Sequence, residues 1–262
     1  MKNLYTLVLM TVVYITLSGC VNFNSPRPVK DTLSQVSTID ALLDGVYDGS
    51  VTCGELKQYG NLGLGTFNKI DGEMIVLDGM IYKASVDGKV YKARDSWKTP
   101  FAAVTFFKPD KKFDISKPLN LEELKKEIDK NLDSENIFYA IKITGTFKNM
   151  KIRSVPPQKK PYPPLKDVVK HQKIFNLDKC RGTIVGFRCP AFVKGINVTG
   201  YHLHFLSDDL KRGGHILNLE TDSVKVMTDS KNNFFLTLPD SASFKISNLK
   251  KDRTSELEKV EK

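Results

Sequence analysis

Three Asp-Gly pairs between residues 59 and 93 restrict the fold more than any other feature of this sequence. They are Asp71-Gly72, Asp78-Gly79 and Asp87-Gly88, and short apolar or alternating runs lie between them. An Asp-Gly pair favours the two-residue turn of an antiparallel hairpin, in which both central residues have positive φ. We therefore predict a meander with strands at residues 65–67, 74–77, 81–85 and 89–93.

The remaining chain consists mainly of further short apolar runs. We predict strands at residues 104–107, 138–147, 181–188, 199–206, 215–226 and 233–238. Apolar residues at intervals of three and four predict an amphipathic helix over residues 119–132, with Asn120 as N-cap, and a second helix over residues 165–174. The expected fold class is α+β, with two sheet-rich halves of mostly antiparallel or mixed strands and few helices. A proline-rich loop at 156–164 divides an N-terminal half, 37–160, from a C-terminal half, 161–262, which holds the metal site and the acidic tail described below.

The positive charge of the chain does not indicate nucleic-acid binding. The 40 Lys and Arg residues exceed the 30 Asp and Glu residues, for a formal net charge of +10. These residues are scattered, however, and no basic block occurs. The densest positive stretch, 148–160, contains prolines and is typical of a surface loop rather than of a groove-reading helix. A nucleic-acid partner is therefore not expected.

The beginning of the chain has the pattern of a targeting segment. Residues 4–17 carry no charge, and Lys2 precedes them. This run is shorter than the roughly 20 residues that span a bilayer, so residues 1–19 are predicted to be a signal peptide. The sequence Leu17-Ser18-Gly19-Cys20 is similar to a bacterial lipoprotein signal. We expect an exported protein that contacts the membrane only through a lipid anchor at Cys20, with residues 20–36 as a tether. Ordinary secretion is the alternative.

Three further cysteines remain if Cys20 is acylated: Cys53, Cys180 and Cys189. An odd number in an exported protein leaves at least one cysteine without a partner in its own chain. Cys180 and Cys189 could pair across a strand connection, but their separation is not a metal-ligand spacing. We interpret all three cysteines as structural.

Three of the four histidines lie between residues 202 and 215, and this cluster is the most informative functional signal. His202 and His204 alternate with apolar or aromatic residues, so on a strand both imidazoles project from one face. The loop at 207–214 contains Asp and Gly residues that can reverse the chain and return His215 beside the first two. Three neutral imidazoles could then bind one cation.

Three protein ligands leave a coordination position open, as in a catalytic zinc site. Structural zinc sites usually have four ligands and favour Cys. Zn²⁺ is therefore the expected cofactor, with water or a substrate in the open position. The alternative is three ordinary strand histidines without metal, but three imidazoles on one patch would repel one another on protonation.

Two other residues could complete such a site. Glu73 follows the Asp71-Gly72 turn at the start of an apolar strand, where its carboxylate could point inward or remain exposed. Arg153 lies just before Pro156-Pro157, where a rigid loop could hold its guanidinium for two hydrogen bonds to a substrate carboxylate. A solvated basic loop is the alternative for Arg153.

Three motifs, in this order, resemble the alpha-acetolactate decarboxylase family. They are Gly63-Leu64-Gly65-Thr66-Phe67-Asn68 with Asp71-Gly72-Glu73-Met74, then Arg153-Ser154-Val155-Pro156-Pro157-Gln158, then Gly200-Tyr201-His202-Leu203-His204 through Gly213-Gly214-His215. The resemblance runs from about residue 37 to residue 239 and more loosely to the C-terminus. It is much more specific than His-x-His alone.

The resemblance implies a zinc-dependent carboxy-lyase that converts 2-acetolactate to acetoin and carbon dioxide in acetoin and butanediol biosynthesis. By motif match the zinc ligands would be His202, His204 and His215. Glu73 and Arg153 would occupy the catalytic acid/base and substrate-binding positions. The family also brings an acidic tail residue to the active site; the best match is Glu261, with Glu256 and Glu258 as alternatives. A homodimer is implied as well.

Two other functions are compatible with the histidines alone. A cupin-like metal oxygenase also has His-x-His on a strand with a later His, but such sites usually have a Glu shortly after the pair, and here the nearest acids are Asp208 and Asp209. A non-catalytic surface lipoprotein that binds zinc for uptake or storage would use the histidines and Cys20 but not Arg153. Iron content and oxygen consumption would identify the first, and readily released zinc the second.

Overall fold

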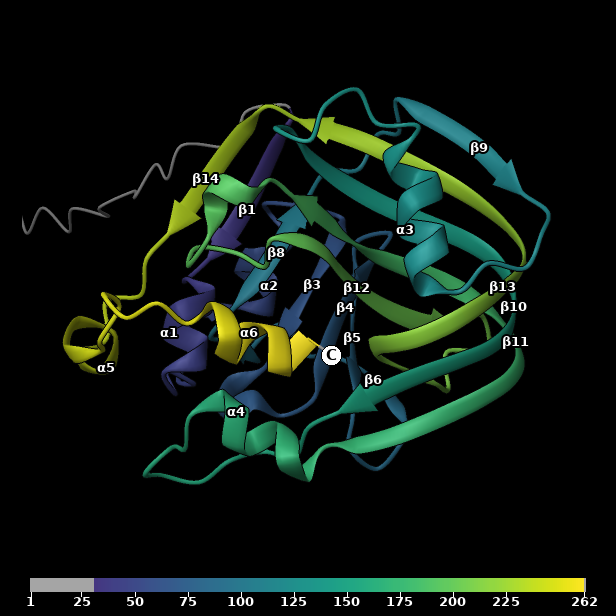
Figure 1. The fold of residues 1–262 in the computed structure, drawn as a ribbon. Helices are drawn as coiled ribbons and strands as arrows, with labels where there is room; N and C mark the ends of the chain where they lie inside the picture. Colours follow the sequence, from purple (N-terminus) through teal and green to yellow (C-terminus); the bar gives the residue numbers. More distant parts are fainter. Residues whose placement is uncertain (1–30, 262) are drawn as a thin grey trace, which may run out of the picture.

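Two β-sheets layered against each other form the body of the computed structural model in Figure 1, which describes residues 31–261. The predicted signal peptide, Cys20 and the first part of the predicted tether lie outside these residues. Within residues 31–261, no helix has both the length and the apolar character needed to cross a membrane. The strands are mostly antiparallel and the helices short, so the predicted α+β class is confirmed.

The first sheet contains seven strands in the order β14-β1-β8-β3-β4-β5-β6. Their bounds are β1 Thr32–Val36, β3 Leu62–Thr66, β4 Glu73–Leu77, β5 Met80–Ala84, β6 Val90–Lys92, β8 Ala102–Thr105 and β14 Asn233–Thr237. Strands β3 to β6 form the predicted antiparallel meander. The predicted tether extended through residue 36, but β1 is a buried strand between β8 and β14, so any tether ends before Thr32. Its neighbours are distant in sequence, and local composition gave no signal for this pairing.

Only one of the three Asp-Gly pairs forms the predicted turn. At Asp78-Gly79, between β4 and β5, both residues have positive φ, at 50° and 80°. At the other two pairs only the glycine does, with φ of 83° at Gly72 and 80° at Gly88. At Asp87-Gly88, backbone hydrogen bonds between Ser85 and Gly88 and between Ser85 and Lys89 close the turn, and the Asp87 carboxylate also accepts from the Lys89 N–H at 3.0 Å.

The second sheet contains five strands in the order β10-β11-β12-β13-β9, and β10 also pairs with β13, so four strands close on themselves. Their bounds are β9 Lys111–Ile115, β10 Phe138–Ser154, β11 Lys173–Cys189, β12 Gly200–Ser207 and β13 Gly213–Lys231. The strand predicted to end at residue 147 continues to Ser154. Arg153 therefore lies on a strand paired on both sides, and the predicted rigid loop around it is wrong.

The sheets do not follow the predicted division of the chain into 37–160 and 161–262. Strands β9 and β10 precede the proline-rich loop but belong to the second sheet, whereas β14 follows it and returns to the first. Prolines mark where a strand ends, but they do not determine which sheet the strand joins. Sheet membership depends on pairing between distant segments.

The helices are short and lie around the sheets. Their bounds are α1 Ile39–Leu43, α2 Cys53–Leu56, α3 Leu121–Asp129, α4 Leu165–Val168, α5 Ala242–Ile246 and α6 Thr254–Glu261, with 3₁₀ turns η1 Asn68–Ile70, η2 Val169–His171 and η3 Ala191–Val193. A small ribbon pairs β2 Val51–Thr52 with β7 Lys98–Thr99. Asn120 caps α3 as predicted, through a hydrogen bond from the Glu123 N–H. The helix predicted over residues 165–174 ends at His171, and β11 begins at Lys173.

Clusters of buried apolar side chains fill the second sheet and the space between the two sheets. One cluster lies inside the closed strands under α3, and a second lies between the sheets, where Leu64 and Ile75 contact the group that includes Val185 and Leu206. A third cluster joins α1, α4 and α6. These contacts bring β4 of the first sheet against β12 and β13 of the second.

The three cysteines of the described chain are all free, and Cys53 and Cys189 are buried. Cys180 and Cys189 lie on the same strand, β11, so the pairing considered from the sequence does not form. Burial raises the pKa of the Cys189 thiol to about 12, which keeps it protonated and unreactive.

Candidate metal centre

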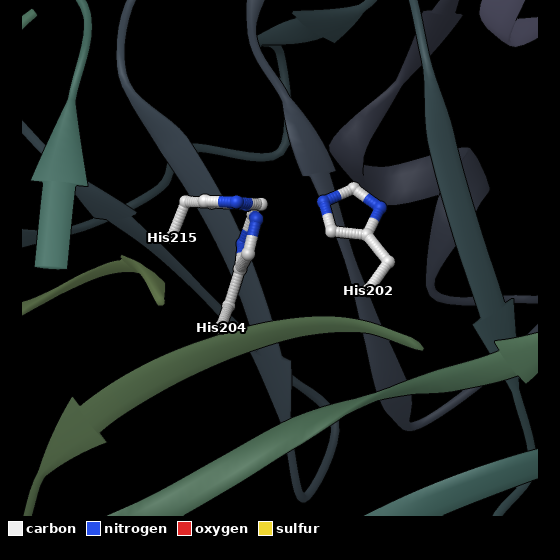
Figure 2. A group of neighbouring side chains, drawn as sticks. All are labelled: His202, His204 and His215. Carbon is white, nitrogen blue, oxygen red and sulfur yellow. The ribbon is translucent and has the colours of Figure 1, made fainter. Parts of the chain in front are cut away.

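The three clustered histidines converge where β12 meets β13 (Figure 2). His204 is directly opposite His215 across the two strands, and His202 is two residues away on β12. The ring centroids lie 5.0 Å apart for His202 and His204, 5.1 Å for His202 and His215, and 5.4 Å for His204 and His215. One ring nitrogen from each residue lies within 4.8 Å of the others. One cation could contact all three.

A glycine before His215 makes this convergence possible. A Cβ atom on Gly214 would lie 2.5 Å from the carbonyl oxygen of Arg153, closer than real Cβ atoms approach. Only glycine therefore lets β13 pair closely with β10 at this point. That pairing places Arg153 directly opposite His215, so the sequence Gly213-Gly214-His215 positions a guanidinium and an imidazole together.

The histidines are buried, with exposed fractions of 9% for His202, 1% for His204 and 2% for His215. Burial, reinforced by the positive charge of Arg153, lowers the pKa of His202 to about 3. Burial also lowers the pKa of His204 and of His215 well below the usual value. All three imidazoles are thus neutral at physiological pH, the state in which histidine binds metal.

A backbone contact fixes the tautomer of His204. Its Nδ1–H donates to the carbonyl oxygen of Met74 on β4, at 2.8 Å, so the lone pair is on Nε2. That Nε2 atom is buried and has no hydrogen-bond partner. The Nδ1 atom of His202 is likewise buried without a partner. Buried nitrogens without partners are costly unless something binds them. This donor set fits a divalent metal ion with nitrogen ligands.

Two carboxylates face the cluster from different elements. Glu73, the first residue of β4, is 7% exposed, and its Oε2 lies 3.7 Å from Nε2 of His204. Glu261, at the end of α6, places Oε2 3.9 Å from Nε2 of His202 and 3.8 Å from Nε2 of His215. Burial raises the pKa of each carboxyl to about 7. Of the two orientations considered for Glu73 from the sequence, inward or exposed, the structure shows the inward one.

The C-terminal residues form helix α6, and only one of the three candidate tail acids faces the histidines. Glu256 binds Arg253 and Lys251 instead of facing the histidines. Glu258 is exposed on the outside of α6. Glu261 alone of the three reaches the cluster.

Arg153 is a buried cation without a carboxylate partner. It is 5% exposed, and within residues 31–261 no Asp or Glu forms an ion pair with it. Its Nη1 donates to Oε1 of Gln172 at 3.4 Å, and its Nε has no partner. Glu73 and Glu261 interact with this charge electrostatically but not at ion-pair distance, so a ligand carboxylate could still pair directly with the buried guanidinium. Gln172 follows η2 and belongs to no recognisable sequence motif, so it could not be identified from the sequence.

A cavity opens between these charged groups and an apolar wall. Its lining includes Glu73, Arg153, His202 and Glu261, together with Thr66. The apolar part of the lining comes from Ile39, Leu42, Ile70, Phe101, Val155, Leu165 and Val260. No sequence motif indicates this wall, because its members come from α1, α4, α6 and several connections. A small organic anion with short alkyl groups fits this combination of a cation, polar groups and apolar contacts.

Comparison with known proteins agrees with the site. The family model described as alpha-acetolactate decarboxylase matches residues 33–251. The alpha-acetolactate decarboxylase of Methanosarcina mazei is 47% identical over 232 residues, covering 88% of this chain and 81% of the relative. That of Bacillus subtilis is 45% identical over 223 residues, covering 85% and 87%.

A solved structure shows the same fold. The crystal structure of alpha-acetolactate decarboxylase from Bacillus subtilis strain 168 superposes with a TM-score of 0.86 and 43% identity, covering 88% of this chain and 99% of that one. The family match, these relatives and the shared fold cover both sheets and all three motifs quoted above. This chain belongs to the alpha-acetolactate decarboxylase family and is a carboxy-lyase that acts on acetolactate.

Proposed function

We propose that this enzyme converts 2-acetolactate to acetoin and carbon dioxide with a zinc ion held by His202, His204 and His215. The observation that carries this proposal is a buried guanidinium with no carboxylate at ion-pair distance, Arg153, which lines one cavity together with His202 of the three-histidine cluster. The cation suits the carboxylate of the substrate. Three nitrogen ligands with a position left open are the donor set of catalytic zinc.

Arg153 binds and orients the carboxylate that leaves. Its guanidinium is buried beside Val155 in the cavity wall, where a charge-assisted contact is stronger than in water. The carboxylate loses its charge when it departs as carbon dioxide. The neutral product acetoin then has no ion pair with Arg153, which favours its release. Arg153 must not stabilise the bound substrate so strongly that the reaction becomes slower.

Decarboxylation leaves an electron pair that must move into the neighbouring ketone. When bound, zinc supplies the Lewis acid that draws this charge towards the ketone oxygen. The carbon that loses carbon dioxide then takes up one proton, so the balanced reaction consumes one proton for each acetolactate anion. We assign this proton transfer to Glu73, whose carboxyl group lies 3.7 Å from His204 at the cavity wall. Delivery from one fixed position would make the product chiral.

Glu261 is the second acid/base group. It contacts His202 and His215, whereas Glu73 contacts His204, so the two carboxyls approach the cluster from different elements. One group can hold a proton at the substrate hydroxyl while the other delivers one to carbon. Val260 and Leu165 cover the same cavity with apolar surface, which limits the access of water to the proton transfer.

The two other candidate functions find no support in the comparisons with known proteins. A cupin-like oxygenase would not explain the similarity to acetolactate decarboxylases along both sheets. A zinc-storage lipoprotein would have no use for a buried, unpaired Arg153. Neither is proposed further.

The proposed reaction can be tested by incubating the purified, zinc-loaded protein with racemic 2-acetolactate and measuring acetoin and carbon dioxide. A parallel sample contains a strong zinc chelator, and a protein-free sample measures the spontaneous decay of the substrate. We expect equal amounts of the two products, far above spontaneous decay, and loss of the reaction with chelator. A folded, zinc-loaded protein that forms no acetoin would overturn the proposal.

We also propose that the protein is exported and held at a membrane by a lipid on Cys20. The support is the apolar run at residues 4–17 and the Leu17-Ser18-Gly19-Cys20 sequence, both outside the described residues. Cys20→Ser should release the protein from the membrane fraction, and unchanged membrane association would contradict the anchor. The homodimer implied by the family resemblance stays a prediction, which light scattering of the purified protein would test.

A further inference from the structure

Glu261, the acid nearest to His202 and His215, lies at the end of a segment that contains no β-strand. We call residues 247–261 the C-terminal strap; it runs from the end of α5 through α6 (Figure 1). Glu261 acts at the last described position of this strap. Its location near the histidines depends on how side chains fasten the strap to the rest of the molecule.

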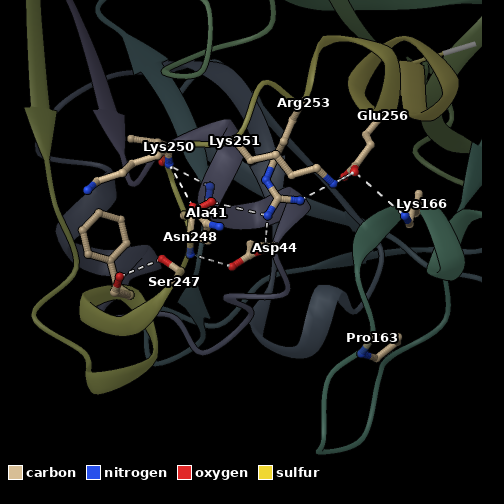
Figure 3. Close-up of polar contacts among 12 residues, drawn as sticks. Ala41, Asp44, Pro163, Lys166, Ser247, Asn248, Lys250, Lys251, Arg253 and Glu256 are labelled. Carbon is tan, nitrogen blue, oxygen red and sulfur yellow. Dashed lines mark hydrogen bonds and ion pairs between the residues drawn. The ribbon is translucent and has the colours of Figure 1, made fainter.

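Arg253 fastens the beginning of α6 to the end of α1 (Figure 3). The side chain is 6% exposed. Its Nη2 forms an ion pair with Asp44, the C-cap residue of α1, and its Nη1 donates to Glu256 at 2.9 Å. The other carboxylate oxygen of Asp44 accepts a hydrogen bond from the backbone N–H of Asn248 at 3.1 Å. Asp44 thus holds the strap at two points.

Apolar contacts hold the other end of α6. Val260 is 3% exposed and belongs to the cluster that includes Leu42 and Val168, and Leu257 packs against the same cluster. Such contacts are non-directional, so they hold α6 against α1 and α4 without fixing its tilt. The hydrogen-bonded ion pair is directional and supplies that constraint.

The length of α6 makes the contact between Arg253 and Asp44 important for the position of Glu261. A helix rises about 1.5 Å per residue, so Arg253 lies roughly 12 Å along the axis from Glu261. A change of about 10° in the direction of α6 displaces its two ends relative to each other by about 2 Å over this length. An error of about 1 Å in the position of a catalytic group can slow a reaction on the order of 100-fold.

We propose that Arg253, held by Asp44, is a positioning residue that sets the place of Glu261 at the active site. This inference rests on the role proposed above for Glu261. A general contribution to stability does not by itself explain the contact, because apolar replacements of a buried ion pair are often as stable, although removing one partner alone is destabilising. Its directional hydrogen bonds instead determine where α6 ends.

The decisive experiment compares four forms of the full chain in the acetolactate assay: wild type, Arg253→Ala, Glu261→Gln and the double variant. We expect kcat of Arg253→Ala to fall at least ~10-fold, with bound zinc unchanged, because Glu261 is displaced while the histidines are not. The double variant should be no slower than Glu261→Gln alone, since Arg253 acts only through Glu261. Asp44→Asn should reproduce the loss.

The matched control is Lys194→Ala, which removes a different side-chain contact to the strap. Lys194 pairs with Asp252 at 2.9 Å, but both side chains are more than half exposed, at 56% and 67%. Removing this surface pair should leave kcat unchanged. Hydrogen exchange in residues 254–261 should accelerate in Arg253→Ala and not in Lys194→Ala.

The outcomes separate this inference from the proposed function. Multiplicative losses in the double variant, or a normal rate in Arg253→Ala beside a slow Glu261→Gln, would overturn the positioning role and leave the role of Glu261 intact. A fully active Glu261→Gln would instead remove the role of Glu261, and the positioning role with it. If Arg253→Ala does not fold, Arg253→Lys keeps the charge and is expected to retain part of kcat; a wild-type rate there, with wild-type exchange in residues 254–261, would contradict the inference.

Discussion

The histidine cluster and the C-terminal strap contribute to the same site but are held in different ways. His204 and His215 lie on paired strands whose neighbours are paired in turn, from β11 through β13 to β10. Glu261 lies at the end of α6, which is held by the Arg253 ion pair and a few apolar side chains. Elements without strand pairing open at lower free energy than a closed sheet. The three histidines should therefore stay in place when the strap moves, whereas Glu261 should move with it.

The largest expected effect is that of His204→Ala. Loss of one of three ligands should abolish tight zinc binding and reduce acetoin formation to the rate of spontaneous decay. Metal analysis after gel filtration and the acetoin assay measure the two effects. The matched control is His171→Ala, because His171 is the histidine outside the cluster and is exposed. Retention of stoichiometric zinc in His204→Ala would refute the assigned site.

Glu261→Gln is the next largest change and tests the other side of the comparison. The amide keeps the shape of the side chain but cannot exchange a proton, so kcat should fall by about 10²–10⁴-fold. Zinc content should stay at the wild-type value because the three histidines lie on strands. Glu258→Gln, on the exposed face of the same helix, is the control. Zinc loss in Glu261→Gln would show that the strap helps to hold the metal.

Arg153→Ala should lower kcat/KM by at least ~10²-fold, because a charge-assisted contact at the reacting group is lost. Zinc should remain bound. Arg153→Lys keeps the charge but not the planar fork, so it should recover only part of the activity. Steady-state kinetics with acetolactate measure both variants, and a change below about threefold in Arg153→Ala would remove Arg153 from the mechanism.

The smallest expected effects come from two buried valines, one in each region. Val226 on β13 is 0% exposed and Val260 on α6 is 3% exposed. Val226→Ala should lower the free energy of unfolding by about 1–3 kcal/mol, because it leaves a cavity in the closed strands. Val260→Ala should lower it by less than about 1 kcal/mol yet reduce kcat, since α6 can detach without unfolding the sheets. Denaturant titration measures the stabilities, and equal losses in both would contradict the distinction.

The parts of the fold that follow from local signals could be predicted from the sequence. The meander at β3 to β6, the capped helix α3 and the convergence of the three histidines all depend on neighbouring residues. His202 and His204 share a face because side chains alternate along a strand. His215 returns to them through the turn at residues 208–212, and Gly214 before it permits close strand pairing with β10.

The parts that depend on distant contacts could not be predicted. Strand β1 was assigned to a tether because its partners, β8 and β14, lie far away in the sequence. Arg153 was placed in a loop because prolines follow it, but pairing with β11 and β13 extends β10 to Ser154. The docking of α6 depends on Leu257 and Val260 and on the contact of Arg253 with Asp44, which lies more than 200 residues away in the sequence. Glu261 was found through family resemblance alone.

A zinc titration of the metal-free wild-type enzyme tests the central claim most directly. Zinc is added in small steps, and bound zinc and the rate of acetoin formation from 2-acetolactate are measured on the same samples. Activity should rise in proportion to bound zinc and reach its maximum at one zinc ion per chain, held by His202, His204 and His215. Full activity in the metal-free protein, or a maximum unrelated to bound zinc, would contradict it.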